Sequence, residues 1–184
     1  MELSIYLNQF EEILNADQPS APYDEEEYFQ YTKMNWARTN RWLKKGQVDP
    51  GVQEVVEAID KAQHWIVITE PWCGDAAQCL PFIYFLSELN PKIKLEIVLR
   101  DQPPFLIEQY LTNGTKSIPK LIIRDGNGND LAVWGPRPKP AQELFESMKA
   151  EERDFEEIKE ELQKWYNKDA GLSVQQEIAD LLAQ

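Results

Sequence analysis

The stretch Ile66–Pro81, with the sequence IVITEPWCGDAAQCLP, constrains the fold of this chain more than any other part of it. It opens with three β-branched residues in a row, as in a strand that is covered on both faces. Glu70 and Pro71 end that strand. From Asp75 onward apolar residues recur at three- and four-residue spacing, as on one face of a helix. The sequence therefore predicts a buried strand, a sharp turn and a helix that begins at Cys73.

Cys73 is the best candidate for chemistry. The unpaired N–H groups and the positive dipole end at a helix N-terminus favour a thiolate, which is the nucleophile in disulfide exchange. Asp75 acts in the opposite direction, because a carboxylate near the sulfur raises the pKa of the thiol. The residues alone leave two interpretations open: a working nucleophile, or a semi-exposed thiol with no redox role.

The residues around Cys73 resemble a family signature. Trp72-Cys73-Gly74-Asp75-Ala76 is similar to the Trp-Cys-Gly-Pro-Cys redox motif of the thioredoxin superfamily. Three further features follow in the family's order: a proline that kinks the helix, a cis-proline loop that leads into a strand, and a glycine after the last strand, at Pro81, Ser117–Ile123 and Gly135. The chain looks most similar to bacterial thioredoxin-family proteins with a Trp-Cys-Gly-Asp-Ala signature.

The resemblance implies a thioredoxin-like fold with a groove beside Cys73. Trp72, Gly74 and the Ile118–Pro119 pair would shape that groove, with a cis peptide bond before the proline. The backbone of Ile118 would then be free to pair with an extended peptide.

Three departures from the family pattern bear on activity. The second motif cysteine is replaced by Ala76, and the motif proline is replaced by Asp75. Val67 occupies the position at which thioredoxins carry a buried acid. The resemblance therefore supports the fold much more than it supports dithiol–disulfide chemistry.

Helical patterns lie on both sides of this core. Helices are expected over residues 3–15, about 24–45 and about 50–59, then after Cys73, over 105–111 and 141–166, and after Gly171. Strands are expected over residues 64–69, 95–99, 120–124 and 131–134. We therefore expect an α/β protein with a central mixed sheet of about four strands flanked by helices. Its parts are an N-terminal helical extension (1–59) packed on the core, a thioredoxin-like core (60–150) and a C-terminal helical extension (151–184), together one compact domain.

The sequence indicates structural roles for Cys79 and His64, the two other residues that could form a disulfide or bind a metal. Cys79 lies six residues after Cys73, a rise of about 9 Å along a helix, whereas a disulfide needs Cα atoms within about 7 Å. Cys79 also falls on the apolar stripe of its helix, which predicts a buried, unreactive thiol. His64 begins the first strand, at the end far from Cys73. The set lacks a short pair of ligands, so neither a metal nor a cofactor is expected.

The charge balance excludes some partners. The net charge is −13, which argues against nucleic acid and against an anionic membrane as partners. Segment 33–45 is basic and contains Trp36 and Trp42, but its pattern fits a core stripe with basic residues that face the acidic C-terminal helix. Two cysteines and no signal-like N-terminus predict free thiols and a cytoplasmic location.

Two functions of different classes remain. The first is a monothiol thiol–disulfide oxidoreductase, in which Cys73 forms a mixed disulfide with a protein or low-molecular-weight thiol and an external thiol completes the cycle. The second is a redox-inactive thioredoxin-fold binding module. A cluster-binding thiol is a third interpretation, but the negative charge of Asp75 argues against an anionic ligand at that place.

Overall fold

Three helices precede the first strand. In the computed structural model, which describes residues 1–183, these are α1 (Leu3–Asn15), α2 (Glu26–Lys45) and α3 (Pro50–Glu57). Asp49 caps α3, because its carboxylate accepts hydrogen bonds from the N–H groups of Gly51 and Val52 at 2.9 and 3.2 Å. No strand precedes residue 63 in the described chain, as the sequence predicts.

The sheet has four strands in the order β2-β1-β3-β4. Its strands are β1 (Gln63–Thr69), β2 (Ile93–Leu99), β3 (Lys120–Asp125) and β4 (Asp130–Trp134). The strands β1 and β2 are parallel, and α4 (Gly74–Glu88) connects them. Antiparallel pairing joins β3 to both β1 and β4. The predicted mixed sheet of four strands is confirmed.

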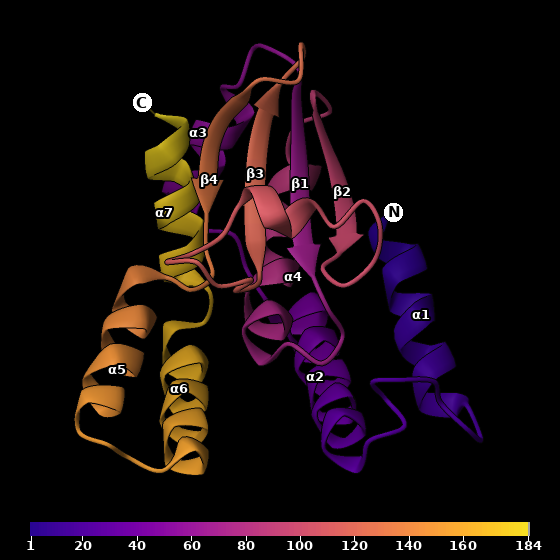
Figure 1. Cartoon of the computed structure of the whole chain (residues 1–184). Helices are drawn as coiled ribbons and strands as arrows, with labels where there is room; N and C mark the ends of the chain where they lie inside the picture. Colours follow the sequence, from indigo (N-terminus) through magenta and orange to yellow (C-terminus); the bar gives the residue numbers. More distant parts are fainter. Residues whose placement is uncertain (184) are drawn as a thin grey trace.

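Helices cover the two faces of the sheet very unequally (Figure 1). On one face Val67, Leu121 and Ile97 pack in a single core with α4 and with residues of both helical extensions, among them Tyr6 and Val174. The extensions therefore belong to the same core as the sheet.

The opposite face of the sheet has a thinner cover. Ile66, Ile68 and Ile122 pack there against Ile107 of a short 3₁₀ helix, η1 (Leu106–Gln109). The sequence predicts a longer helix over residues 105–111. Phe105 has a positive φ of 53° and is the N-cap of η1, not part of the helix. The helical stretch is therefore limited to four residues.

The predicted long helix over 141–166 is wrong. Two helices are found there, α5 (Lys139–Ala150) and α6 (Phe155–Asp169), followed by α7 (Leu172–Leu182). Glu152 turns the chain with a φ of 55°. The carboxylate of Asp154 then accepts from the N–H of Glu156 at 2.7 Å and starts α6. Asp154 followed by Glu157 is a capping signal that the apolar spacing of 141–166 conceals.

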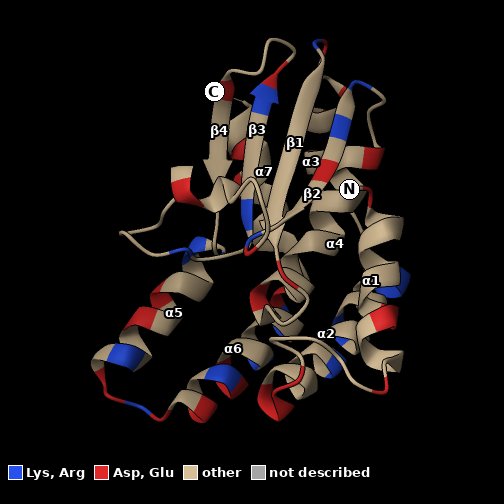
Figure 2. Ribbon diagram, turned by 45° about the vertical axis from the view of Figure 1, so that its right-hand side comes forward, with Lys and Arg blue, Asp and Glu red and all other residues tan. Residues whose placement is uncertain are grey.

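The helices α2, α5 and α6 lie beyond the end of the sheet at which β1 stops, whereas α3, α4 and α7 lie behind it (Figure 1). Acidic and basic residues are distributed along α2, α5 and α6 (Figure 2). None of the helices in the described residues is long and apolar enough to cross a membrane.

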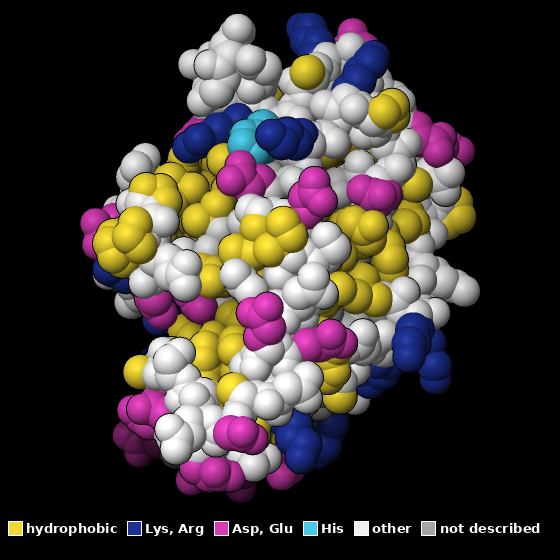
Figure 3. Space-filling view, turned by 90° about the vertical axis from the view of Figure 1, so that its right-hand side faces the viewer, with side chains coloured by type: hydrophobic (Ala, Val, Ile, Leu, Met, Phe, Trp, Pro, Cys, Tyr) yellow, Lys and Arg dark blue, Asp and Glu magenta, His cyan; other side chains and the backbone are white. Residues whose placement is uncertain are grey.

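The edge of the sheet at β2 is partly covered by the N-terminus. The main-chain N–H of Ile97 donates to the Met1 carbonyl, and the Met1 amino group donates to the Ile97 carbonyl. His64 lies on the same side, with its Nε2 2.9 Å from Glu96. Figure 3 shows this side, where hydrophobic side chains reach the surface in separate places among charged ones. His64 is thus a strand-end residue that faces Glu96, far along β1 from Cys73.

Candidate functional site: a cavity in front of Cys73

Cys73 is the N-cap of α4 and is buried. Its main-chain N–H donates to the Glu70 carbonyl at 3.0 Å, which closes the turn after β1. The thiol donates to the Ile118 carbonyl at 3.3 Å and accepts from the N–H of Ala76 at 3.5 Å. Only 6% of the residue is exposed. The sequence predicts the position at the helix start correctly, but it does not predict this burial.

The environment of Cys73 keeps the sulfur protonated. Burial raises its pKa to about 12, and the charge of Asp75 adds to the increase. The N–H of Ala76 and the guanidinium of Arg137 lower the pKa but do not offset these effects. Desolvation thus outweighs the helix N-terminus, which on its own would favour a thiolate.

Asp75 is held by two side chains from distant parts of the chain. Its carboxylate forms an ion pair with Arg137 at 2.8 Å and accepts a hydrogen bond from the Tyr166 hydroxyl at 2.8 Å. Arg137 lies in the loop after β4, and Tyr166 lies in α6. The sequence gives no signal for either partner, because both are more than 60 residues away in the chain.

The other motif residues named from the sequence lie around Cys73. Ala76 and Ile118 are buried in one cluster with Cys73, and the Ile118–Pro119 peptide bond is cis. Trp72 packs edge-to-face against Tyr28 with ring centroids 5.7 Å apart, and the guanidinium of Arg100 lies 4.5 Å from its ring. The Ile118 carbonyl already accepts one hydrogen bond, from the Cys73 thiol.

Cys79 does not take part in the site. It is fully buried on α4, and both cysteines are free thiols. Burial raises its pKa well above the ordinary value. The described residues contain no group of three or more His, Cys, Asp and Glu side chains that could hold a metal ion.

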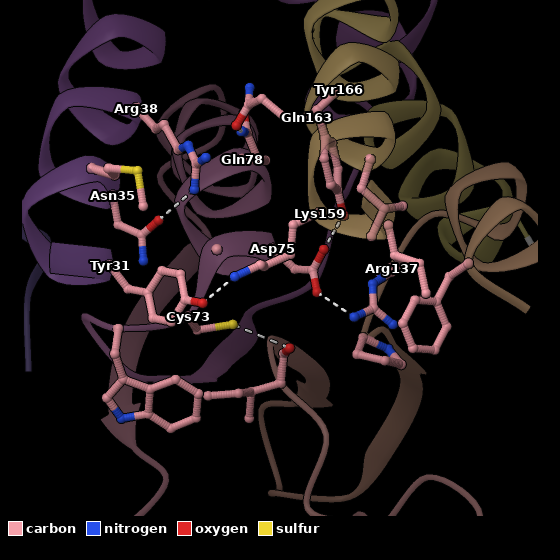
Figure 4. A pocket seen from close by; sticks show the side chains of 18 of the residues that line it. Tyr31, Asn35, Arg38, Cys73, Asp75, Gln78, Arg137, Lys159, Gln163 and Tyr166 are labelled. Carbon is pink, nitrogen blue, oxygen red and sulfur yellow. Dashed lines mark hydrogen bonds and ion pairs between the residues drawn. The ribbon is translucent and has the colours of Figure 1, made fainter. Parts of the chain in front are cut away.

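A cavity of about 750 Å³ lies in front of this motif. Cys73, Gly74, Asp75 and Ile118 line its base, which we call the floor. Its two walls are formed by α2, and by α6 together with α5 and the loop before α5 (Figure 4). Wall residues include Tyr28, Tyr31, Asn35, Arg38, Phe145, Ile158 and Leu162. The helical extensions therefore have a definite place: they enclose the space in front of Cys73.

The polar residues of the walls are ordered by contacts with the floor. Asn35 is fully buried, and its amide donates to the Pro71 carbonyl at 3.1 Å, just before Trp72. Arg38 donates to the amide oxygen of Asn35 at 3.0 Å (Figure 4). Basic residues of segment 33–45 form no ion pair with the acidic residues of α6 in the described structure, contrary to the simple charge match that the sequence indicates.

Comparison with known proteins identifies the fold. A family model described as thioredoxin matches residues 21–149. The match starts well before residue 60, so it takes in α2 and α3 as well as the predicted core. No curated protein matches the chain.

Two solved structures are similar along most of the chain. A crystal structure of an HIV epitope scaffold has a TM-score of 0.57 and 20% identity, covering 84% of this chain and 88% of that chain. A protein of unknown function from Pseudomonas aeruginosa has a TM-score of 0.54 and 18% identity, covering 100% of this chain and 96% of that chain. At this identity both likenesses concern the fold alone. The second shows that the fold shared with it includes the helices at both ends.

Proposed function

Since the chain belongs to the thioredoxin family, we propose that it is a redox-inactive binding member of that family, with its ligand site in the cavity in front of Cys73. The observation that carries this proposal is the state of Cys73. A buried thiol whose pKa is raised to about 12 is almost entirely protonated at neutral pH. Disulfide exchange requires the thiolate, so the ordinary activity of the fold is suppressed at its first step.

The rest of the site supports binding. Ala76 and Cys79 leave the motif without a second thiol in reach, because Cys79 is buried further along α4. The cavity has the volume of a small-molecule site and mixes apolar walls with a few ordered polar groups. Two free thiols support a cytoplasmic location, and the motif supports a bacterial origin; both belong to the proposal.

A monothiol oxidoreductase is the second candidate, favoured by one observation: Cys73 lines the cavity. In that reaction the Cys73 thiolate would attack one sulfur of a protein or low-molecular-weight disulfide. A new S–S bond would form to Cys73, and the other half would leave as a thiolate. An external thiolate would then attack the substrate-derived sulfur of the mixed disulfide, and Cys73 would leave as a thiolate. The external thiol ends up oxidised, in a new disulfide with that half of the substrate, and the half released first ends up reduced.

Thiol counting with Ellman's reagent at pH 7 separates the two candidates. The chain has two cysteines, so protein unfolded in guanidinium should release two equivalents of thionitrobenzoate quickly. Native protein should release almost none over the same period. Insulin reduction with dithiothreitol as the electron source should not rise above the background without protein. Rapid native labelling of Cys73 together with steady turnover would establish the oxidoreductase instead.

A further inference from the structure

The walls of the cavity form an apolar slot with several aromatic rings. Tyr28, Tyr31 and Met34 of α2 lie on one side, and Phe155, Ile158 and Leu162 of α6 on the other. At its outer part the Lys159 ammonium of α6 donates to the Tyr31 hydroxyl and lies over the Phe155 ring. Ile158 and Leu162 are buried, whereas Phe155 and Met34 are exposed, so the slot runs from the core to the surface. Such a space accepts a flat apolar group of small-molecule size.

One cation in this slot has no counter-ion among residues 1–183. The other lysines and arginines of the cavity lining each have a carboxylate partner: Arg100 with Asp101, Arg137 with Asp75, Lys159 with Glu156 and Lys164 with Glu161. Among the residues described, none supplies a carboxylate within ion-pair distance of Arg38.

Arg38 is half-buried, and Asn35 holds its guanidinium in place. Within residues 1–183, the one hydrogen bond of Arg38 goes to the Asn35 amide oxygen at 3.0 Å. Burial lowers the pKa of Arg38, and the charge of Arg41 lowers it further, against the opposing effect of Asp75. A half-buried guanidinium without a carboxylate loses part of its hydration and gains no ion pair in return. Carboxylates are abundant in this chain, whose net charge is −13, so the lack of one beside Arg38 is a specific feature of the site.

We propose that the cavity binds a small organic carboxylate, with its carboxylate on Arg38 and its apolar, aromatic body between α2 and α6. This inference rests on the proposed binding function and specifies its ligand. A guanidinium has five N–H donors in a planar fork, and Asn35 takes only one of them. The remaining donors suit two parallel hydrogen bonds to a carboxylate.

The acidic residues of the cavity do not favour a cationic ligand. Asp75 is the carboxylate of the floor, and it already forms an ion pair with Arg137 and accepts a hydrogen bond from Tyr166. Glu27, Glu156 and Glu160 also line the cavity, but all three are exposed, so water and salt screen their charge. The uncompensated charge inside the slot is therefore positive.

A matched pair of probes tests this ligand class by calorimetry. The acid 1-naphthylacetate and the neutral alcohol 1-naphthaleneethanol have the same ring and nearly the same length. Wild-type protein should bind the acid at least tenfold more tightly than the alcohol. Arg38→Gln should weaken binding of the acid at least tenfold and change binding of the alcohol by less than twofold.

The control variant is Lys44→Gln, which removes one positive charge from an exposed position of the same helix. It should bind both probes like the wild type. If Arg38→Gln does not fold, Arg38→Lys carries the test: it keeps the charge, loses the fork, and should weaken only the acid.

Three results would overturn the inference: no binding of the acid, equal affinity of wild-type protein for acid and alcohol, or an equal loss of acid binding in Lys44→Gln. Binding of the alcohol without preference for the acid would reject this ligand class and leave the proposed binding function intact. Steady disulfide turnover would reject the proposed function itself, whatever the probes do.

Discussion

The floor and the walls of the cavity differ in how they are built. The floor consists of residues near Cys73 and near Ile118, and each polar group there has a partner: the thiol has the Ile118 carbonyl, and Asp75 has Arg137 and Tyr166. The walls come from helices at opposite ends of the chain and contain a cation, Arg38, for which the described part of the chain supplies no counter-ion. The floor is satisfied without a ligand, whereas the walls are not, so binding should depend on the walls and stability on the floor.

The strongest way to break the floor is at Gly135, which has a φ of 111°. A β-carbon there would lie 2.3 Å from the Pro119 carbonyl oxygen, against which the backbone packs. Gly135→Ala should therefore lower the free energy of unfolding by about 3 kcal/mol or more.

Gly128 is the matched control, since it also has a positive φ but a β-carbon there meets no atom within 4 Å. Gly128→Ala should cost about 1 kcal/mol in the same denaturant titration. Equal losses would show that the contact with Pro119 does not matter.

The second test is Asp75→Asn, which removes the ion pair between Asp75 of the floor and Arg137 of the wall. It leaves the guanidinium of Arg137 unpaired in a mostly buried place, so the free energy of unfolding should fall by about 2 kcal/mol. It also removes a negative charge that raises the pKa of Cys73. Alkylation of Cys73 by iodoacetamide at pH 8 should speed up, about tenfold for each unit of decrease in the pKa.

Tyr166→Phe is the control for this variant. It removes the hydrogen bond to Asp75 and keeps the charge, so Cys73 should be alkylated at the wild-type rate within about twofold. Faster alkylation in Tyr166→Phe would mean that wall packing, rather than the charge of Asp75, protects the thiol.

Alkaline pH should weaken the floor through Cys73. The pKa of the thiol is about 12 in the folded chain and about 8.5 in an unfolded chain. Above pH 8.5 the unfolded chain loses the proton while the folded chain retains it, so rising pH favours unfolding. The contribution of this thiol is fully present below pH 8.5 and should fall by about 1.4 kcal/mol per pH unit up to about pH 12.

Comparison with Cys73→Ala isolates this contribution from those of the buried tyrosines and Cys79. Denaturant titrations between pH 8 and pH 11 should give the wild type a steeper loss of stability than the variant. Parallel losses would show that the thiol has no raised pKa in the folded state.

The smallest expected effect concerns a wall alone. Asp154→Ala removes the N-cap of α6 and should cost about 1 kcal/mol, with faster hydrogen exchange in the first turn of that helix. The reactivity of Cys73 should not change, because no residue of that turn contacts the thiol. A clear rise in alkylation would show that floor and wall are one cooperative unit.

The sequence predicts the floor much better than the walls. Periodicity locates β1, α4 and the hairpin of β3 and β4, and the motif order predicts that Cys73 and Ile118 meet. The strands and the helix follow from local sequence patterns, and the contact between Cys73 and Ile118 follows from the thioredoxin-like fold. The walls depend on where helices from both chain ends pack, and no local pattern in α2 or α6 specifies that packing.

The same limit explains why the sequence left the state of the thiol open. The position of Cys73 at a helix start is a local property, and it favours a thiolate. Its burial depends on Ile118, which arrives 45 residues later, and the partners of Asp75 arrive later still. The pKa follows from this three-dimensional environment, in which desolvation has the largest effect.

The most direct test of the account is a titration of Cys73 in a Cys79→Ser background, so that a single thiol remains. Thiolate absorbance near 240 nm, followed against a Cys73→Ala, Cys79→Ser control that subtracts the tyrosines, gives the pKa in the folded state. We expect a value well above the ordinary range for cysteine, close to 12. A value at or below about 8 would mean that the helix N-terminus prevails over burial and that the thiol is a working nucleophile.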